Sequence, residues 1–451
     1  MNKYDLAIIG SGPCGYAAAV KAARSGMKVC VFEKDRIGGV CLNWGCIPAK
    51  TLSASARILS DIKRSSEFGV NIKEYSVDYD KVQARKDQVI KKLASGIEML
   101  FKTRKIEVIK EKAVIKNKGS ILAGSREISS KNILIAAGSL PFEVPGISFD
   151  GIDVLSSTDA LSLKAVPKSI LIIGGGVIGC EFASILRTFG SEIVIVEMTE
   201  QLLPNEDAEI SRKLEEVFKK RGISIYTGTK VESIEKKKDF LKAILSRGIA
   251  VDSEKALVCV GRSPNSKDLG LEEIGISSDR GWINVDENYR TDIDDIYAAG
   301  DVKGGMLLAH VASREGICAV EAMLGKKTSL DYGVVPNCIF TEPEIASVGL
   351  SEKAAKTEGL NARSRKFLFS AIGKAHVIGE TEGFIKMVVN NDDDRILGAQ
   401  IIGPHATELI AEISPCVQLG ITSEKLAGVI HAHPTLSEAI QEVAEAARTH
   451  I

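Results

Sequence analysis

The amino-acid sequence predicts an α/β protein that contains two separate strand–helix–strand units of the Rossmann type. Each unit is indicated by a glycine-rich turn that lies between a short apolar run and a run rich in helix-forming residues. Several further apolar runs end in glycine turns, which is typical of the strands of a parallel sheet. The chain of 451 residues is long enough for about three domains of ordinary size.

The first unit lies within residues 5–33. The run "DLAII" predicts a strand, "GSGPCG" supplies Gly10, Gly12 and Gly15, "YAAAVKAARSG" predicts a helix, and "KVCVFE" predicts a second strand that ends at Glu33. In such a unit the first glycine permits a tight turn, the second lets the backbone approach a pyrophosphate, and the third lets helix and strand pack closely. The Glu33 carboxylate would accept hydrogen bonds from a ribose. The alternative is a tight turn that binds no ligand.

The second unit is "SILIIGGGVIGCEFASILRTFGSEIVIVE" (169–197). Gly174, Gly176 and Gly179 follow a predicted strand and precede a helix, and the second strand ends at Glu197. Two such units predict two bound dinucleotides. The segment after Glu197, "MTEQLLP", offers no Arg or Lys to a 2′-phosphate. Since the carboxylate would also repel that phosphate, NAD is favoured over NADP.

Three further segments predict strands whose carboxyl ends meet a ligand crevice. They read "KNILIAAGSLP" (131–141), "KALVCVGRSPN" (255–265) and "DIYAAGD" (295–301). In open α/β sheets, ligands bind at the carboxyl ends of the strands. The alternative for each segment is an ordinary turn from strand to loop.

The charge balance gives no sign of a nucleic-acid or membrane partner. Lys and Arg number 58 against 59 Asp and Glu, so the net charge is -1, whereas nucleic-acid-binding domains usually carry a basic excess. No apolar run approaches the roughly 18 residues of a membrane span, and the first apolar run is too short for a secretory signal. We therefore expect a cytoplasmic protein, although a processed organelle-matrix protein would look the same.

The segment "GGVCLNWGCIPAKT" (38–51) carries Cys41 and Cys46. A regular helix would separate their Cα atoms by roughly 8.6 Å, beyond the reach of a disulfide, so pairing needs an irregular turn, which Gly45 and Pro48 permit. A structural disulfide over so short a loop would stabilise little, and a zinc site would need further ligands nearby. The nine cysteines are an odd number and fit a reducing compartment, so a redox pair is favoured over inert thiols.

These segments together resemble the pyridine nucleotide-disulfide oxidoreductases over nearly the whole chain. "GGVCLNWGCIPAKTL" is similar to the active-site disulfide motif of that family, and "HAHPTLSEAIQEVAEAA" to its C-terminal catalytic segment. "TEPEIASVGLSE" and "RILGAQIIGPHATELIAE" are similar to its interface domain. The resemblance adds a C-terminal α+β dimerisation domain to the two Rossmann-like domains. The predicted domains are 1–145 (FAD-binding, first part), 146–265 (NAD-binding), 266–333 (FAD-binding, second part) and 334–451 (dimerisation).

The resemblance also implies the roles of the reacting residues. Cys41 would exchange with a substrate dithiol, and Cys46 would lie against the flavin in a thiolate–flavin charge-transfer contact. Lys50 would lie near the flavin ring and pair with Glu181. No metal site is expected.

A second group is expected from the other subunit of a homodimer. His433 would take the proton of the substrate dithiol, and Glu438 would orient it. From the residues alone, "TLSE" (435–438) also fits a capping box, so that Glu438 could be only a helix cap and His433 only a turn residue.

The resemblance assigns the remaining site residues to two cofactors, FAD and NAD. The FAD set is Gly10, Gly12, Gly15, Glu33, Ala113, Gly138, Ser139, Asp301, Ala309 and His310. The NAD set is Gly174, Gly176, Gly179, Glu197, Val231 and Gly261.

The implied activity is oxidation of dihydrolipoamide on lipoyl-domain proteins of 2-oxo-acid dehydrogenase or glycine cleavage complexes, with reduction of NAD to NADH. One alternative is a related NAD(P)H-dependent disulfide reductase for a low-molecular-weight thiol, which Glu197 disfavours. Mercuric reductase is disfavoured because the tail "EAARTHI" has no cysteine pair. A non-catalytic flavoprotein or scaffold subunit is disfavoured by the intact reacting residues. Trp44 and Ala49 depart from the usual family pattern without removing a reacting atom.

Overall fold

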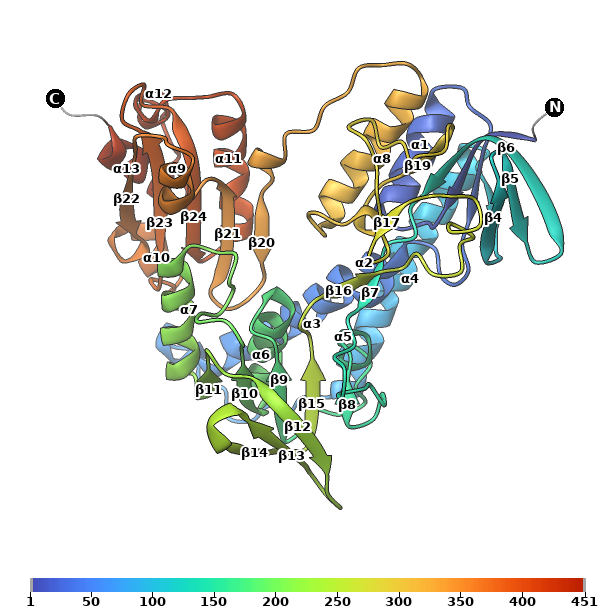
Figure 1. The fold of residues 1–451 in the computed structure, drawn as a ribbon. Helices are drawn as coiled ribbons and strands as arrows, with labels where there is room; N and C mark the ends of the chain where they lie inside the picture. The colour runs from blue at the N-terminus through green and yellow to red at the C-terminus, as the bar shows by residue number, and fades with distance from the viewer. Residues whose placement is uncertain (1–2, 449–451) are drawn as a thin grey trace.

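The computed structural model describes residues 3–448, so the outermost residues of the first and last predicted domains lie outside it. Three large sheets are arranged along the molecule, with the N-terminal sheet at the right of Figure 1, the second sheet below the centre and the C-terminal sheet at the left. The predicted fold class is confirmed: two Rossmann-like parallel sheets are joined to a C-terminal antiparallel sheet. The domain boundaries proposed from the sequence stay predictions.

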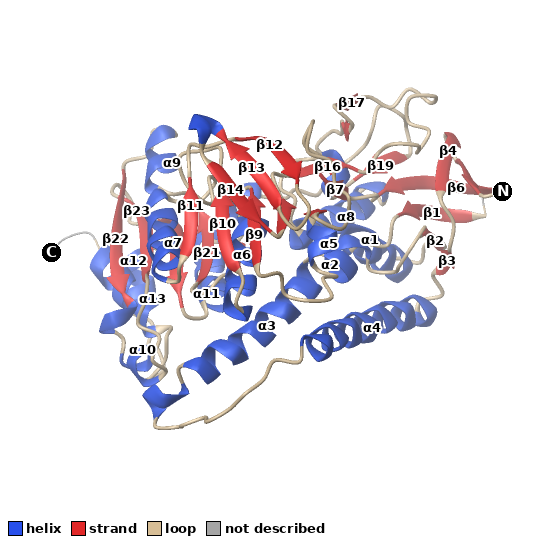
Figure 2. Cartoon of the chain, turned by 90° about the horizontal axis from the view of Figure 1, so that it is seen from below, coloured by secondary structure: helices blue, strands red, loops and turns tan. Residues whose placement is uncertain are grey.

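The first sheet has the strand order β3-β2-β1-β6-β5-β4, and β19 also pairs with β6. Its parallel part is β1 (Tyr4–Ile9), β2 (Val29–Phe32), β3 (Glu107–Ile109), β6 (Arg126–Ile135) and β19 (Ile296–Ala298). The hairpin β4 (Ala113–Asn117) and β5 (Ser120–Ala123) extends it. Helices α1 (Pro13–Arg24) and α8 (Ala309–Met323) lie side by side against the sheet (Figures 1 and 2), since α1 buries the small side chains of Ala18, Ala19 and Ala22.

The second sheet has the order β11-β10-β9-β15-β8, and all its pairs are parallel. Its strands are β8 (Val154–Leu155), β9 (Ser169–Ile173), β10 (Glu192–Val196), β11 (Ile223–Tyr226) and β15 (Lys255–Val258). Its helices are α5 (Ser157–Ala160), α6 (Val177–Phe189) and α7 (Ala208–Lys220). An antiparallel sheet of β12 (Val231–Lys236), β13 (Leu241–Leu245) and β14 (Ala250–Ser253) adjoins it. In both units the second strand ends one residue before the predicted acidic residue.

The third sheet is antiparallel in the order β20-β21-β24-β23-β22. Its strands are β20 (Asn337–Ile339), β21 (Glu344–Gly349), β22 (Ala362–Leu368), β23 (Phe384–Asn390) and β24 (Ile396–Gly403). Its helices are α9 (Glu352–Thr357), α10 (Gly373–Val377), α11 (Ala406–Gln418), α12 (Ser423–Ala427) and α13 (Glu438–Ala447). One apolar core joins this sheet to α11 and α13.

Helices α2 (Gly39–Trp44), α3 (Cys46–Lys63) and α4 (Tyr79–Thr103) connect the sheets, and α3 and α4 run along the lower side of Figure 2. Ala49, Leu52 and Ala56 of α3 belong to one core with Phe182 of α6 and Ile339 of β20. The start of α3 is therefore fixed by both the second and the third sheet. The short strands are β7 (Ser139–Pro141), β16 (Arg262–Pro264), β17 (Ser278–Asp279) and β18 (Trp282–Ile283). Within residues 3–448, no helix is both long and apolar enough to span a membrane.

Candidate active site

A break between two helices brings the predicted redox cysteines together. Helix α2 ends at Trp44, Gly45 has φ −147° and ψ −110°, and α3 begins at Cys46. A Cβ atom on Gly45 would lie 3.1 Å from the Val40 carbonyl oxygen and 3.3 Å from the Cys41 Cα atom, so the break packs closely against α2. The cysteines are free thiols that lie close enough for each to shift the pKa of the other.

The surroundings of the two thiols favour a negative charge on Cys46. The hydrogen bond from Cys41, followed by the nearby Lys50 ammonium, lowers the pKa of Cys46 to about 7, although burial and the Glu181 carboxylate oppose this shift. The pKa of Cys41 is raised, because its proton is held in the hydrogen bond to Cys46 and its sulfur is buried. Since the thiolate is the reactive form of cysteine, the pair can attack or release sulfur near neutral pH.

The predicted partners Lys50 and Glu181 form an ion pair beside the cysteines. The Lys50 Nζ atom lies 2.8 Å from both carboxylate oxygens of Glu181, whose side chain is only 7% exposed. Lys50 lies one helical turn after Cys46 on α3, and Glu181 lies on α6, so the pair joins the redox helix to the second Rossmann-like unit.

The first glycine turn has the geometry that a dinucleotide requires. Gly10 has φ +105°, in the left-handed region that favours glycine. A Cβ atom on Gly15 would lie 1.9 Å from the Gly10 carbonyl oxygen, so helix α1 meets the strand as closely as the sequence predicts. Ser11 donates to the Glu33 carboxylate from its N–H (3.1 Å) and its hydroxyl (2.6 Å).

The second turn repeats this arrangement. Gly174 has φ +111°, and a Cβ atom on Gly179 would lie 2.0 Å from the Gly174 carbonyl oxygen. Glu197 accepts from the Gly175 N–H (2.6 Å), the Thr199 N–H (2.7 Å) and the Thr199 hydroxyl (2.8 Å). Both acidic residues therefore lie at the carboxyl edge of their sheets.

Gly12 and Gly176 are the N-cap residues of α1 and α6. As glycines, they have no side chain that could cap the first helical turn. Free N–H groups at the positive end of a helix suit phosphate oxygens. Together with the close helix–strand approaches and the two acidic residues, these features fit FAD at the first turn and a nicotinamide dinucleotide at the second.

A hydrogen-bonded chain links three segments at the edge of the first sheet. The Ser139 hydroxyl donates to Asp301 Oδ2 (2.5 Å), and Arg262 donates from Nε to the Ser139 hydroxyl (2.6 Å) and from Nη2 to the Ser139 carbonyl (2.7 Å). The sequence predicted Ser139 and Asp301 but gave Arg262 no role. The sequence feature that could have indicated a role for Arg262 is its position directly after Gly261, at the end of a predicted strand segment.

The other predicted cofactor residues lie at three places. Ala113 begins β4 with a buried side chain, so only its backbone could contact a ligand. Ala309 and His310 begin α8, and burial lowers the pKa of His310. Val231 begins β12 near the second turn. Gly138 and Gly261 lie in the loops that follow β6 and β15, with φ +76° and φ +140°.

Within one chain, the structure does not bring His433 to the cysteines. Helix α13 and helix α2 occupy separate parts of the molecule (Figure 1). The His433 Nδ1 atom lies 2.8 Å from Glu438 Oε1, and the imidazole is 77% exposed. Its other ring nitrogen is therefore available to a second molecule.

The capping box at 435–438, which the sequence left open as an alternative, is only half formed. Helix α13 begins at Glu438 with Ser437 as its N-cap, so Glu438 cannot be the third helical residue. The Thr435 N–H still donates to Glu438 Oε2 (2.9 Å), but the Thr435 hydroxyl donates to the Ala432 carbonyl instead of capping the helix. Glu438 thus holds both the Thr435 backbone and the His433 ring.

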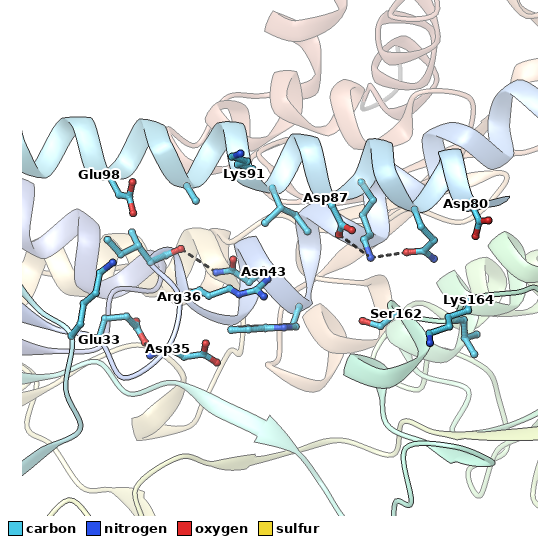
Figure 3. Close-up of a pocket in the computed structure, with 18 residues that line it drawn as sticks. Glu33, Asp35, Arg36, Asn43, Asp80, Asp87, Lys91, Glu98, Ser162 and Lys164 are labelled. Carbon is cyan, nitrogen blue, oxygen red and sulfur yellow. Dashed lines mark hydrogen bonds and ion pairs between the residues drawn. The ribbon is translucent and has the colours of Figure 1, made fainter. Parts of the chain in front are cut away.

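Trp44 lines a cavity of about 800 Å³ that Glu33 also lines. Figure 3 shows Glu33 and Asp35 on one side of this cavity and the α4 residues Asp87 and Lys91 on the other. The Arg36 guanidinium lies 5.9 Å from the centre of the Trp44 ring, within range of a cation–π interaction. The tryptophan between the cysteines therefore belongs to this cavity wall.

Among residues 3–448, no group of three or more His, Cys, Asp or Glu side chains could hold a metal ion.

Two family models match the chain. "Pyridine nucleotide-disulphide oxidoreductase" matches residues 4–316, and the dimerisation domain of the same family matches residues 335–444. The second match supports a homodimer.

Curated relatives match over almost the full length. A dihydrolipoyl dehydrogenase of Bacillus subtilis (strain 168) is 43% identical, covering 99% of this chain and 98% of its own length. A dihydrolipoyl dehydrogenase of Chlorobaculum parvum is 42% identical, covering 99% and 97%.

Solved structures are similar in fold. LpdA from Mycobacterium tuberculosis superposes with a TM-score of 0.92 at 29% identity, covering 98% of this chain and 99% of its own. A Cu(II) complex of the HOCl-induced flavoprotein disulfide reductase from Escherichia coli superposes with a TM-score of 0.90 at 30% identity, covering 99% and 100%. With both family models matched and relatives above 40% identity over nearly every residue, the chain belongs to the pyridine nucleotide-disulphide oxidoreductase family.

Proposed function

We propose that this protein is a flavin-dependent enzyme that oxidises dihydrolipoamide to lipoamide and reduces NAD to NADH. The observation that carries the proposal is the adjacent thiol pair Cys41 and Cys46 beside the Lys50–Glu181 ion pair, in a chain with two nucleotide-binding turns. The full-length likeness to dihydrolipoyl dehydrogenases supports this substrate. The physiological substrates would be lipoyl-domain proteins of 2-oxo-acid dehydrogenase or glycine cleavage complexes.

In this proposal the chain's own residues carry the thiol–disulfide exchange. His433 of the partner subunit removes a proton from one substrate thiol, and the resulting thiolate attacks the Cys41 sulfur of the oxidised pair. The Cys41–Cys46 bond breaks, and Cys46 leaves as a thiolate, which its lowered pKa favours. The second substrate thiolate then attacks the mixed disulfide, which releases lipoamide and the reduced pair.

The bound cofactor would be held by the first glycine turn, Glu33 and the Ser139–Asp301 pair. When bound, FAD supplies a two-electron carrier between the reduced cysteine pair and NAD. Lys50 and Glu181 would fix the charge next to the pair, and the second turn with Glu197 would hold NAD. Oxidation of one dithiol and reduction of one NAD then balance at two electrons.

The direct test is turnover of purified protein. The protein should bind FAD and reduce NAD with dihydrolipoamide. Cys46→Ser should lower this turnover by about a thousandfold or more while FAD stays bound. Cys416→Ser is the matched control, because the Cys416 thiol donates to the Glu412 carbonyl (3.3 Å) and a serine hydroxyl can do the same.

A preference for NADPH with glutathione disulfide would overturn the proposal in favour of a low-molecular-weight disulfide reductase. The trans position of His433 has its own test, in which Cys46→Ser and His433→Gln chains are co-expressed. If each site combines both subunits, the mixed dimer keeps one intact site and regains about half the activity. If each site lies within one chain, the mixed dimer is inactive.

A further inference from the structure

A turn of the third sheet lies directly against α3, which carries Cys46 and Lys50, and α6, which carries Glu181. The Phe340 N–H donates to Glu181 Oε1 (2.9 Å), and the Glu342 N–H donates to the Ser184 hydroxyl (3.1 Å). Glu181 and Ser184 are three residues apart and share one face of α6. The Glu342 carboxylate also accepts from the Ser60 hydroxyl of α3 (2.8 Å). The turn 340–343 therefore fixes α3 and α6 relative to each other.

Phe340 contacts both members of the ion pair beside the cysteines. Its N–H holds one Glu181 oxygen, and the Lys50 ammonium lies 4.6 Å from the centre of its ring. That distance is within the range in which an aromatic face attracts a cation. Lys50 is thus held between a carboxylate on α6 and an aromatic ring at the end of β20.

We propose that Phe340 is a positioning residue for the redox site, which holds the Lys50 ammonium and the Glu181 carboxylate in place beside Cys46. The proposal rests on the proposed function in one respect, the assignment of Cys41 and Cys46 as the redox pair. It makes the dimerisation domain part of the electrostatic environment of the thiols, through one turn that follows β20.

Several groups act on the charge of Cys46, and the position of one of them depends on Phe340. The charged and titratable groups that face Cys46 from the elements around it are Tyr16 of α1, Cys41 of α2, Lys50 of α3, Glu181 of α6 and Arg262 of β16. Lys50 lowers the pKa of the Cys46 thiol, whereas Glu181 raises it. Loss of the ring would let Lys50 move within its flexible stem and weaken its effect on the thiolate.

The test is the pH profile of thiol alkylation in the FAD-loaded, dithiol-reduced protein, with the modified cysteine identified by mass spectrometry. Phe340→Leu keeps the N–H that holds Glu181 but removes the ring. We expect the profile of Cys46 to shift upward by about half a pKa unit, so that its thiolate fraction at pH 6 falls roughly threefold. Phe340→Tyr restores an aromatic face and should return the wild-type profile.

Two further variants separate positioning from packing. Ile339→Val removes a methylene group from the adjacent buried residue, which lies in the same core as Leu52, and should leave the profile unchanged. In a Lys50→Met background, Phe340→Leu should cause no further shift, because the cation on which the ring acts is gone. An unshifted profile in Phe340→Leu, an equal shift in Ile339→Val, or an undiminished shift in the Lys50→Met background would each overturn the proposal. Because alkylation needs no turnover, failure of this proposal is distinct from failure to oxidise dihydrolipoamide.

Discussion

In both nucleotide-binding regions, the acidic residue after the second strand accepts a hydrogen bond from the residue after the first glycine. The Ser11 N–H lies 3.1 Å from Glu33, and the Gly175 N–H lies 2.6 Å from Glu197. The helices also meet their strands equally closely in the two regions. The backbone geometry of the two turns is therefore the same, and any difference in ligand binding has to come from the residues around each turn.

The surroundings of the two helix N-termini differ. A Cβ atom on Gly39, at the start of α2, would lie 2.6 Å from the Gly12 Cα atom, so α2 packs directly against the N-terminus of α1. A Cβ atom on Gly176 would meet no atom within 4 Å among the described residues. A covered site suits a cofactor that stays bound through many turnovers, and an open site suits one that exchanges. The contrast supports FAD at the first region and NAD at the second.

The largest expected contrast is between the thiols of the two regions. The hydrogen bond from Cys41 lowers the pKa of Cys46 to about 7, whereas burial raises that of Cys259, beside the second turn, to about 12. At pH 7 the thiolate fractions then differ by about 5 × 10⁴. Lower nucleophilicity of the more acidic thiol offsets part of this difference, so iodoacetamide should modify Cys46 about a hundredfold faster.

The alkylation rates of the two thiols should also depend differently on pH. Alkylation of Cys46 should rise through pH 7 and level off above it, because the thiolate fraction then saturates. Alkylation of Cys259 should still rise tenfold per pH unit at pH 8. Peptide mapping by mass spectrometry measures both rates, with Cys259→Ser to identify the second signal. Equal rates at pH 7 would contradict the contrast.

A second prediction tests whether the two close approaches serve two different ligands. A methyl group at Gly15 or Gly179 would lie 1.9 Å or 2.0 Å from a carbonyl oxygen of the preceding turn. Alanine at either position should lower the free energy of unfolding by about 3 kcal/mol, because helix and strand must separate. Gly15→Ala should also lose FAD, whereas Gly179→Ala should keep FAD and lose NAD affinity. Denaturant unfolding, the flavin absorbance per chain and NADH binding measure these effects, and the opposite pairing would exchange the two assignments.

The sequence predicted the two units well because their chemistry is local. Gly10, Gly15 and Glu33 lie within one strand–helix–strand unit, so spacing alone predicts their arrangement. The roles of Arg262 and Phe340 could not be predicted, because each contacts a segment more than a hundred residues away. The local pattern at 435–438 indicated a capping box, of which only the Thr435 N–H bond to Glu438 forms. The second Glu438 oxygen lies against His433, and helix α13 begins at Glu438, later than the pattern indicates.

A third prediction separates ligand contact from folding. Gly12 and Gly176 have ordinary φ values of −66° and −74°, and the nearest atom to a Cβ on Gly12 is the Gly39 Cα atom at 3.8 Å. Alanine at either position should therefore change the free energy of unfolding by less than about 0.5 kcal/mol. If these glycines let a pyrophosphate approach, Gly12→Ala should lower FAD occupancy, and Gly176→Ala should raise the KM for NAD about tenfold. Normal binding of both cofactors would remove these glycines from the two sites.

The smallest expected effect concerns the charge that selects the nicotinamide cofactor. Glu197→Gln removes the negative charge that would face a 2′-phosphate, and keeps an acceptor oxygen for either Gly175 or Thr199, which bond different oxygens of Glu197. The preference for NAD over NADP, measured as a ratio of kcat/KM values, should then fall about tenfold. Glu33→Gln is the matched control, because Glu33 has the same position in the first region. Glu33→Gln should weaken FAD binding, because Glu33 is proposed to hold the FAD ribose. It should leave the preference for NAD over NADP unchanged, because that preference is assigned to Glu197. A shift in Glu33→Gln as large as that in Glu197→Gln would mean that the preference does not arise at the second region.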